Sequence, residues 1–534
     1  MWRSRVNYRP GAPAGRVCSV RSVPIAGLDE RGPPVEGIPV RLPHRNRGRR
    51  ALTALVATAV AAPVLIAASP ADARTGDDPA RQHRKAERLA RQLERESSAK
   101  GAYRHLKAFQ RIADANGGNR AAGTPGHEAS TTYVYKLLKQ AGYRVSYQDF
   151  TIWDAKTTAE KLSVLSPDPR ELKVTAGKLS PSTPAAGIQA QIAVARADET
   201  PGCTADDYAS DTFTGKIALI KRGVCGYAEK QAAAAKAGAI GAIIYNHSGT
   251  APARPRFDSP ADGKIPTAGI SLADGEALTA AAAKGPVKLS LTVQQQHIAK
   301  TTRNVVAETR GGDADHVVAL GSHLDSVPEG PGINDNGSGS AGLLEVALKL
   351  ARKTQHPTNK VRFAWWSGEE LGLLGSDHYV KQLSPEQRKK IALYLNFDMI
   401  ASPNAAELVY DGDDSDHKGS GPGPKGSAEI EKLITGYLDR KHKPHEGTDF
   451  DGRSDYGPFI DAGIPAGGTF TGAEGIKTKE QAEKFGGTAG VAYDPNYHSK
   501  GDTLQNIDLK YFDTNIDVIA HAVGIYAHDL SSLG

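Results

Sequence analysis

The sequence of 534 residues has few cysteines, no surplus of positive charge over most of its length, and a single long apolar run. The net charge of +6 arises in residues 1–73, where eleven Arg face four acidic residues, so residues 74–534 carry about −1. This balance gives no electrostatic support to nucleic-acid binding. Residues 74–534 also contain no run long and apolar enough to span a bilayer, and no internal repeat or heptad array. The length and composition predict a soluble globular protein with more than one domain.

The apolar run near the N-terminus predicts an export signal. The basic segment 45–50 precedes the Ala-rich run 51–68, and Ala71-Asp-Ala73 matches a small-residue cleavage site. We therefore expect residues 1–73 to be a signal peptide or leader, and the mature protein to be secreted with no stable membrane insertion. A retained membrane helix is the alternative, which Pro63 within the run disfavours.

Only three cysteines are present, and Cys18 would be lost with the signal. Cys203 and Cys225 remain as a pair in a chain that meets an oxidising environment. We expect a disulfide between them, with two free buried thiols as the alternative. Such a bond would stabilise the fold by roughly 3 kcal/mol on loop-closure grounds.

The chain changes character along its length. Residues 74–100 are densely charged without a clear apolar stripe, so we expect a flexible leader or a solvated helix. Helical spacing of apolar residues follows from residue 103, and residues 143–152 alternate as a strand. Between about 160 and 300 the pattern predicts short strands and one helix, which indicates a separate, mostly β domain. The strands are expected at 216–222, 239–245, 265–271 and 287–293, and the helix at 227–237.

From residue 302 strands and helices alternate regularly, which predicts an α/β fold with a mostly parallel, mixed sheet sandwiched by helices. The strands are expected at 316–321, 361–366, 391–397, 407–410 and 464–470. The helices are expected at about 338–354, 371–383, 427–441 and 510–531. In such sheets, functional sites form beyond the carboxyl ends of the strands.

Potential metal ligands cluster beyond these predicted strand ends. A pair of divalent ions needs a bridging carboxylate and terminal ligands on each side. The glycines around Asp335 would let its loop turn sharply and present that carboxylate centrally. His323 and Asp398 could then serve one ion, and Glu370 and His498 the other.

Two further acidic residues have distinct expected roles. Asp325, two residues after His323, is placed to orient the imidazole. Glu369 lies beside a ligand, and a free carboxylate near an activated water is what a general base requires. Each residue taken singly could be an ordinary loop residue or helix cap. Their recurrence at several strand ends favours a paired-metal hydrolase.

The ordered motifs around these residues resemble those of the co-catalytic zinc aminopeptidases. This family includes the secreted bacterial leucine aminopeptidases, with glutamate carboxypeptidase and glutaminyl cyclase as distant relatives. The resemblance covers about 103–160 and 300–531. The motifs are Asn116-Gly-Gly-Asn-Arg120-Ala-Ala-Gly-Thr-Pro-Gly126, His323-x-Asp325, Gly-Ile-Asn-Asp335-Asn-Gly-Ser-Gly, Gly-Glu369-Glu370-Leu-Gly-Leu, Asn-Phe-Asp398-Met, Gly452-Arg-Ser-Asp455 and Tyr497-His498.

This resemblance implies a zinc-exopeptidase fold with two zinc ions. One zinc would bind His323, Asp335 and Asp398. The other would bind Asp335, Glu370 and His498.

The resemblance also assigns roles beyond the zinc ligands. Glu369 would be the general base and acid, and Tyr497 would donate to the developing oxyanion. Arg453 would hold the N-terminal end of the substrate, or else take part in a surface ion pair. Asp513 and Asp517 lie one helical turn apart, where some relatives bind calcium.

The segment 185–299 resembles a protease-associated (PA) domain, on the motif that runs from Gly215 through Cys225 to Tyr245. It would interrupt a peptidase domain made of 101–160 and 300–534. Its role would be that of a lid or access module, or of a passive spacer.

These resemblances predict a secreted metallo-aminopeptidase that removes N-terminal, Leu-like or hydrophobic residues from peptides or proteins. A carboxypeptidase would need a basic cluster, and only Arg453 is evident. A glutaminyl cyclase typically uses one zinc. A catalytically inactive ectodomain usually lacks the base or a ligand, and none is missing here.

Overall fold

The computed structural model describes residues 79–533, apart from 209–211 and 420. The expected signal or leader, residues 1–73, lies outside the described residues. Within the described part of the chain, no helix combines the length and apolarity that crossing a membrane requires.

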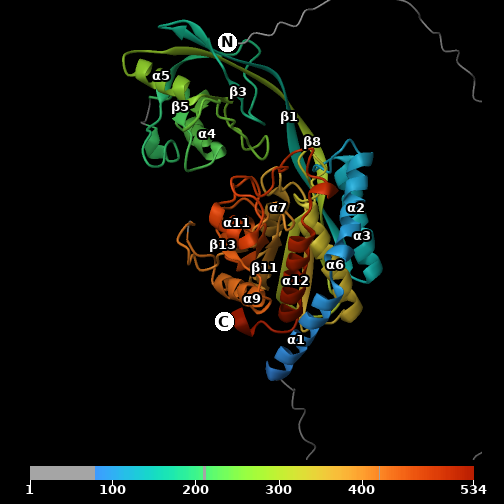
Figure 1. Ribbon diagram of the computed structural model, residues 1–534. Helices are drawn as coiled ribbons and strands as arrows, with labels where there is room; N and C mark the ends of the chain where they lie inside the picture. The colour runs from blue at the N-terminus through green and yellow to red at the C-terminus, as the bar shows by residue number, and fades with distance from the viewer. Residues whose placement is uncertain (1–78, 209–211, 420, 534) are drawn as a thin grey trace, which may run out of the picture. The chain divides into compact units, whose positions relative to one another are not determined.

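A mixed sheet forms the centre of the peptidase part (Figure 1). Its four central strands, β14, β11, β9 and β10, run parallel, while β8 is antiparallel to β10 and β12 is antiparallel to β14. This arrangement confirms the expected mostly parallel, mixed sheet. In spatial order the strands are β13 (Glu446–Thr448), β12 (Leu408–Tyr410), β14 (Ala466–Phe470), β11 (Ile391–Phe397), β9 (Asp313–His323), β10 (Asn359–Trp366), β8 (Lys288–Glu308) and β1 (Arg144–Ser166).

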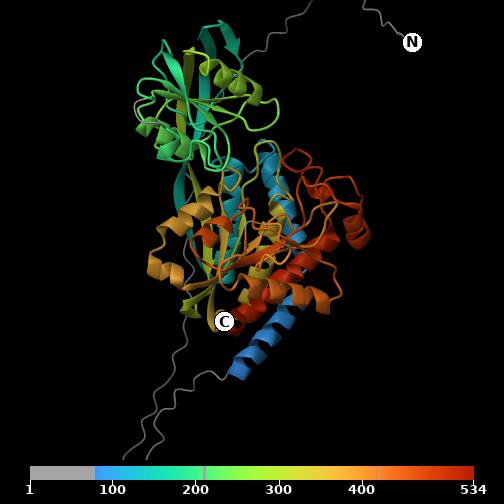
Figure 2. The same cartoon turned by 90° about the vertical axis from the view of Figure 1, so that its left-hand side faces the viewer.

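Helices cover both faces of this sheet, because neighbouring residues of each central strand point to opposite sides. In β9, Val318 and Leu320 pack into one core with α2, α6, α9 and α12, whereas Val317 and Ala319 pack into another with α7 and α10. Figure 2 shows α12 and α2 on one side and α7 on the other. The helices are α2 (Ala99–Ala115), α3 (Pro125–Ala141), α6 (Gly337–Lys353), α7 (Leu374–Gln382), α8 (Pro385–Lys389), α9 (Ser427–Arg440), α10 (Gly457–Asp461), α11 (Lys479–Phe485) and α12 (Leu509–Tyr526).

The inserted domain has its own core around a sheet in which β4, β5, β6 and β7 are parallel. Two helices accompany it, so its strands and helices alternate more than the expected mostly β pattern. Its elements are β2 (Arg170–Leu172), β3 (Thr175–Ala176), β4 (Ile188–Val194), β5 (Ile217–Lys221), α4 (Tyr227–Lys236), β6 (Gly241–Tyr245), β7 (Thr267–Ile270) and α5 (Leu272–Ala282).

Two long antiparallel strands, β1 and β8, connect the inserted domain to the peptidase sheet. The expected boundaries near residues 160 and 300 therefore fall inside continuous strands. The inserted sheet also includes β3, which precedes the expected start at residue 185. A run of alternating residues carries no mark of the point at which a strand passes from one sheet to another.

The charged segment 74–100 is helical over most of its length, which agrees with the second of our two alternatives, but the helix is packed on one face rather than fully solvated. Most of it forms helix α1 (Pro79–Glu96), which packs against α12. The contact is close: a Cβ added at Gly524 of α12 would lie 2.2 Å from the Cα of Ala90. Four residues of α1 are buried in this contact, and two of them are alanines. Small apolar residues among many charged ones do not form a clear apolar stripe in the sequence. The buried residues are Ala86, Leu89, Ala90 and Leu93.

Cys203 and Cys225 form a disulfide in the inserted domain, as expected. Their Cα atoms lie 5.8 Å apart, and the bond closes a loop of 22 residues. Replacing both cysteines with Ser should lower the stability of this domain by about 2–4 kcal/mol and increase its sensitivity to proteases. Hydrolysis of a small aminoacyl-nitroanilide should barely change, because the candidate catalytic residues all lie outside the insert. Limited proteolysis with a parallel activity assay measures both effects, and two free thiols in the unfolded wild type would contradict the bond.

Candidate active site and metal centre

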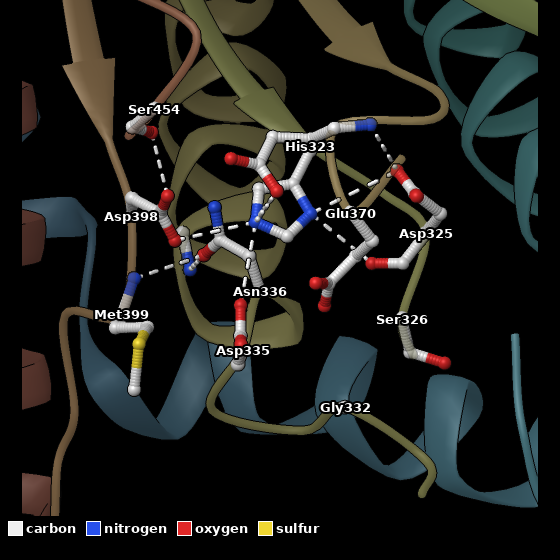
Figure 3. A network of polar contacts seen from close by, with 12 residues as sticks. His323, Asp325, Ser326, Gly332, Asp335, Asn336, Glu370, Asp398, Met399 and Ser454 are labelled. Carbon is white, nitrogen blue, oxygen red and sulfur yellow. Dashed lines mark hydrogen bonds and ion pairs between the residues drawn. The ribbon is translucent and has the colours of Figure 1, made fainter. Parts of the chain in front are cut away.

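The candidate ligands meet at the carboxyl edge of the parallel strands. His323 is the last residue of β9, and Asp398 directly follows β11. Glu369 and Glu370 follow β10 after a short turn. Since β9, β10 and β11 are parallel, their carboxyl ends lie at the same edge of the sheet. The structure therefore brings together the residues that the sequence placed at strand ends (Figure 3).

Asp335 enters the site from the loop that precedes α6. The loop turns at Gly332, whose φ of 61° favours glycine and where a Cβ would lie 2.4 Å from the carbonyl oxygen of Asp335. The backbone N–H of Asp335 donates to the Asp502 carboxylate at 2.9 Å. Asn336 then caps α6, because its side-chain oxygen accepts from Gly339 N–H at 3.0 Å.

Asp335 presents one carboxylate oxygen to each of two groups of side chains. Its Oδ1 lies 3.3 Å from Nε2 of His323, which is also 3.3 Å from Oδ1 of Asp398. Its Oδ2 lies 3.2 Å from Nε2 of His498, which is 3.0 Å from Oε2 of Glu370. In each group of three, the ligand atoms lie within 4.8 Å of one another. A shared carboxylate between two such groups is what a pair of metal ions requires.

The buried polar atoms of these side chains fit metal ligation. Nδ1 of His323 lies 3.1 Å from the carbonyl oxygen of Asp325, which can only accept, so the proton resides on Nδ1 and the lone pair on Nε2. Within the part of the chain that the structure describes, that Nε2 has no hydrogen-bond partner, and neither do Oδ1 of Asp398 and Oε1 of Glu370. Buried polar atoms normally have a partner, so these three are available to a cation. The nitrogen and carboxylate donors match the preferences of zinc.

Asp325 contacts the His323 imidazole through its backbone rather than through its side chain. Its backbone carbonyl accepts from the imidazole, whereas its carboxylate oxygen lies 3.8 Å from Nδ1. That carboxylate instead accepts from the backbone N–H of Glu369 at 3.4 Å. Asp325 thus connects the loop after β9 with the loop after β10.

Glu369 lies close to both groups but belongs to neither. Its Oε2 is 3.8 Å from Nε2 of His323, and its side chain lines the central cavity. Burial raises the pKa of Glu369 well above its usual range, and the nearby carboxylates of Asp398 and Asp455 raise it further, against the opposing effect of His323. A carboxyl group with a raised pKa holds a proton more readily than an exposed one, which suits a group that takes and returns a proton.

The cavity beside these groups has a volume of about 80 Å³. Tyr497 and Arg453 both line it, and Nη2 of Arg453 donates to the Tyr497 hydroxyl at 3.2 Å. Arg453 also forms an ion pair with Glu474 at 2.9 Å. It therefore lines the cavity and takes part in an ion pair at the same time. Apolar atoms form part of the wall, from Met399, Tyr410, Phe470 and Ala473.

Several residues that support the site had no role predicted from the sequence. Asp502 binds the backbone N–H groups of Asn334 and Asp335 at 2.6 and 2.9 Å, and Ser454 donates to Asp398 at 2.6 Å. Ser454 lies in the Gly452-Arg-Ser-Asp455 motif, which was a signal for it, whereas Asp502 had none. The fully buried Arg120 donates to three backbone carbonyls of the loop before Asp335.

The acidic residues considered for other ions lie apart from this centre. Asp513 accepts from the N–H of Ala99 at 2.7 Å. Among the described residues, no group of three or more potential ligands includes Asp513 or Asp517. The acidic run after residue 410 contributes to two groups of potential ligands, one with Glu431 and one with Asp449. The groups are Asp411, Asp413 and Glu431, and Asp414, Asp416 and Asp449.

Comparison with protein families identifies two segments. Residues 304–523 match the model of peptidase family M28, and residues 188–278 match the PA domain. Both matches lie where the motifs placed them.

Individual relatives span most of the chain. It is 44% identical to a probable lipoprotein aminopeptidase of Mycobacterium tuberculosis, over 80% of this chain and 84% of that protein. It is 46% identical to leucine aminopeptidase 2 of Trichophyton equinum, over 77% of this chain and 80% of that protein.

Among solved structures, an aminopeptidase from Aneurinibacillus sp. strain AM-1 matches with a TM-score of 0.62 and 26% identity, over 81% of this chain and 95% of that one. A zinc aminopeptidase from Bacillus subtilis matches with a TM-score of 0.52 and 26% identity, over 82% and 99% of the two chains. Identity of this extent with relatives of similar length, together with the ligand groups at the carboxyl edge of the sheet, shows that this chain belongs to peptidase family M28 and carries an inserted PA domain.

Proposed function

We propose that this protein is a secreted zinc aminopeptidase that hydrolyses N-terminal, Leu-like or hydrophobic residues from peptides by means of two zinc ions. The position of Asp335, with one oxygen facing each ligand group, is the observation that carries the two-zinc proposal. The names of the relatives support the aminopeptidase activity and the Leu-like preference. The expected signal and the disulfide support export.

The chain would hold the two ions in the ligand groups already described, with Asp335 shared between them. When bound, the zinc ions would supply a water of lowered pKa and polarise the scissile carbonyl. Glu369 would accept the proton of the attacking water and then deliver it to the leaving amine, which its raised pKa favours. Tyr497 would donate its hydroxyl hydrogen to the oxyanion.

Arg453 would position Tyr497, since its guanidinium donates to the phenol oxygen and leaves the hydroxyl hydrogen free to point at substrate. The free amine of the substrate would meet the acidic side chains that line the cavity, which selects exopeptidase action. These acids include Glu369, Glu370, Asp398, Asp449 and Asp451.

The alternative chemistries have less support from the cavity. A carboxypeptidase must bind a terminal carboxylate with free cations. Among the described residues that line the cavity, Arg453 is the one Lys or Arg, and it already pairs with Glu474. A glutaminyl cyclase with one zinc would leave one ligand group without a role.

Hydrolysis of aminoacyl-nitroanilides tests the proposal. We expect the purified protein to cleave leucyl-nitroanilide, to leave N-acetylated analogues intact, and to lose activity on chelation and regain it with Zn²⁺. Peptides that report C-terminal cleavage serve as the control. Equal cleavage of N-blocked and free substrates would contradict the assignment as an aminopeptidase.

Calcium near Asp513 and Asp517 stays a prediction from the family resemblance. Burial and the neighbouring Asp513 raise the pKa of Asp517 to about 7, and a bound cation would relieve that repulsion.

The PA domain as a lid or access module also stays a prediction.

A further inference from the structure

The motif Asn116–Gly126 contains a charged residue with no role in the proposed chemistry. Arg120 has 0% of its surface exposed, yet its guanidinium forms no ion pair with any carboxylate of the described residues. Its donors meet backbone carbonyl oxygens instead. Nε donates to Pro331 at 2.9 Å, Nη2 donates to Gly332 at 2.5 Å, and Nη1 donates to Leu324. A buried cation is costly unless it is bonded in this way, so the contacts account for its burial.

These three carbonyls stand at the two ends of one segment. Leu324 lies between His323 and Asp325, while Pro331 and Gly332 lie just before Asp335. The guanidinium therefore joins the end of β9 to the loop that presents Asp335. The backbone reinforces this connection, because the N–H of Arg120 donates to Ser326 Oγ at 2.9 Å.

The shape of arginine suits this position better than that of lysine. A planar guanidinium presents donors in fixed directions, whereas an ammonium group is a point charge with rotating donors. The space is close, since a Cβ at Gly332 would lie 3.2 Å from Nη2 of Arg120. The Phe109 ring covers the guanidinium at 5.1 Å and excludes water from it.

We propose that Arg120 is a positioning residue that sets the zinc affinity of the group formed by His323, Asp335 and Asp398. It holds the segment 324–332 so that Oδ1 of Asp335 stays opposite Nε2 of His323. Because its donors are used by carbonyls, the ligand carboxylates stay free to bind metal. This inference rests on the proposed zinc centre.

Zinc affinity of the mature chain, measured by competition with a chromophoric chelator, tests the proposal. Arg120→Gln should bind zinc about 10–100-fold more weakly, the range for loss of a residue that orients metal ligands. Arg120→Lys should lose less, because it keeps the charge and some of the donors. If Arg120→Gln does not fold, the zinc affinity of Arg120→Lys tests the proposal by itself.

Arg362→Lys is the matched control. Arg362 is also a largely buried arginine, and it binds Glu308 of β8 and the Tyr379 hydroxyl of α7, neither of which belongs to a ligand group. Its substitution should lower the melting temperature of the metal-free protein and leave zinc affinity unchanged. Zinc affinity within twofold of wild type in both Arg120 variants would overturn the inference, and so would an equal loss in Arg362→Lys. Absence of bound zinc in the wild type would instead overturn the proposed function, and the inference with it.

Discussion

Glu369→Gln should lower turnover by roughly two to four orders of magnitude while the protein keeps its zinc. The amide retains the size of the carboxylate, but it cannot accept and return a proton. Glu369 lies in neither ligand group, so the substitution removes no donor to the metal. Steady-state hydrolysis of leucyl-nitroanilide, with zinc content measured on the same sample, gives both quantities.

Glu370→Gln is the control for this prediction, because it changes the neighbouring carboxylate in the same way but removes a ligand donor. It should lower zinc content, whereas Glu369→Gln should not. Near-normal turnover in Glu369→Gln at full zinc occupancy would show that another group acts as the base.

A second large effect is expected at the shared carboxylate. Asp335→Asn should impair binding of both zinc ions, because Oδ1 faces one ligand group and Oδ2 faces the other. An amide offers one oxygen and no negative charge, so it cannot serve both sides. The expected result is loss of zinc from both positions, with activity lost in parallel, measured as zinc equivalents after dialysis.

Asp325→Asn provides the matched comparison. It should reduce affinity or activity by about 10–100-fold, less than Asp335→Asn. The backbone carbonyl that binds His323 is kept, whereas the carboxylate loses its charge and its contact with Glu369 N–H changes. Two full equivalents of zinc in Asp335→Asn would exclude the shared role of this residue.

Much of this architecture could be predicted from local patterns. Alternation along β9, where Val318 and Leu320 face one core and Val317 and Ala319 the other, is a property of neighbouring residues. So is the position of His323 and Asp398 at strand ends, because a strand ends where its apolar run ends. Parallel strands then fix a common edge, which is why these ligands were predictable as a group.

The tertiary structure decided the features that depend on a partner distant in the chain. The packing of helix α1 was not predicted because Ala86 and Ala90 form an apolar face only against a helix that offers Gly524. The continuity of β1 and β8 between two sheets depends on which strands pair on either side of them.

The same distinction holds within the site. Residue types and motif order determined which side chains are candidate metal ligands, because imidazole and carboxylate donors are fixed by the sequence. Their geometry came from contacts across more than a hundred residues. Asp502 holds the Asp335 backbone, and Arg120 clamps the loop before it. Asp325 binds His323 through its backbone carbonyl. The direction of that carbonyl depends on the path of the backbone, which the identity of the residue does not predict. Spacing along the chain cannot encode such contacts, because they depend on where the folded chain returns to itself.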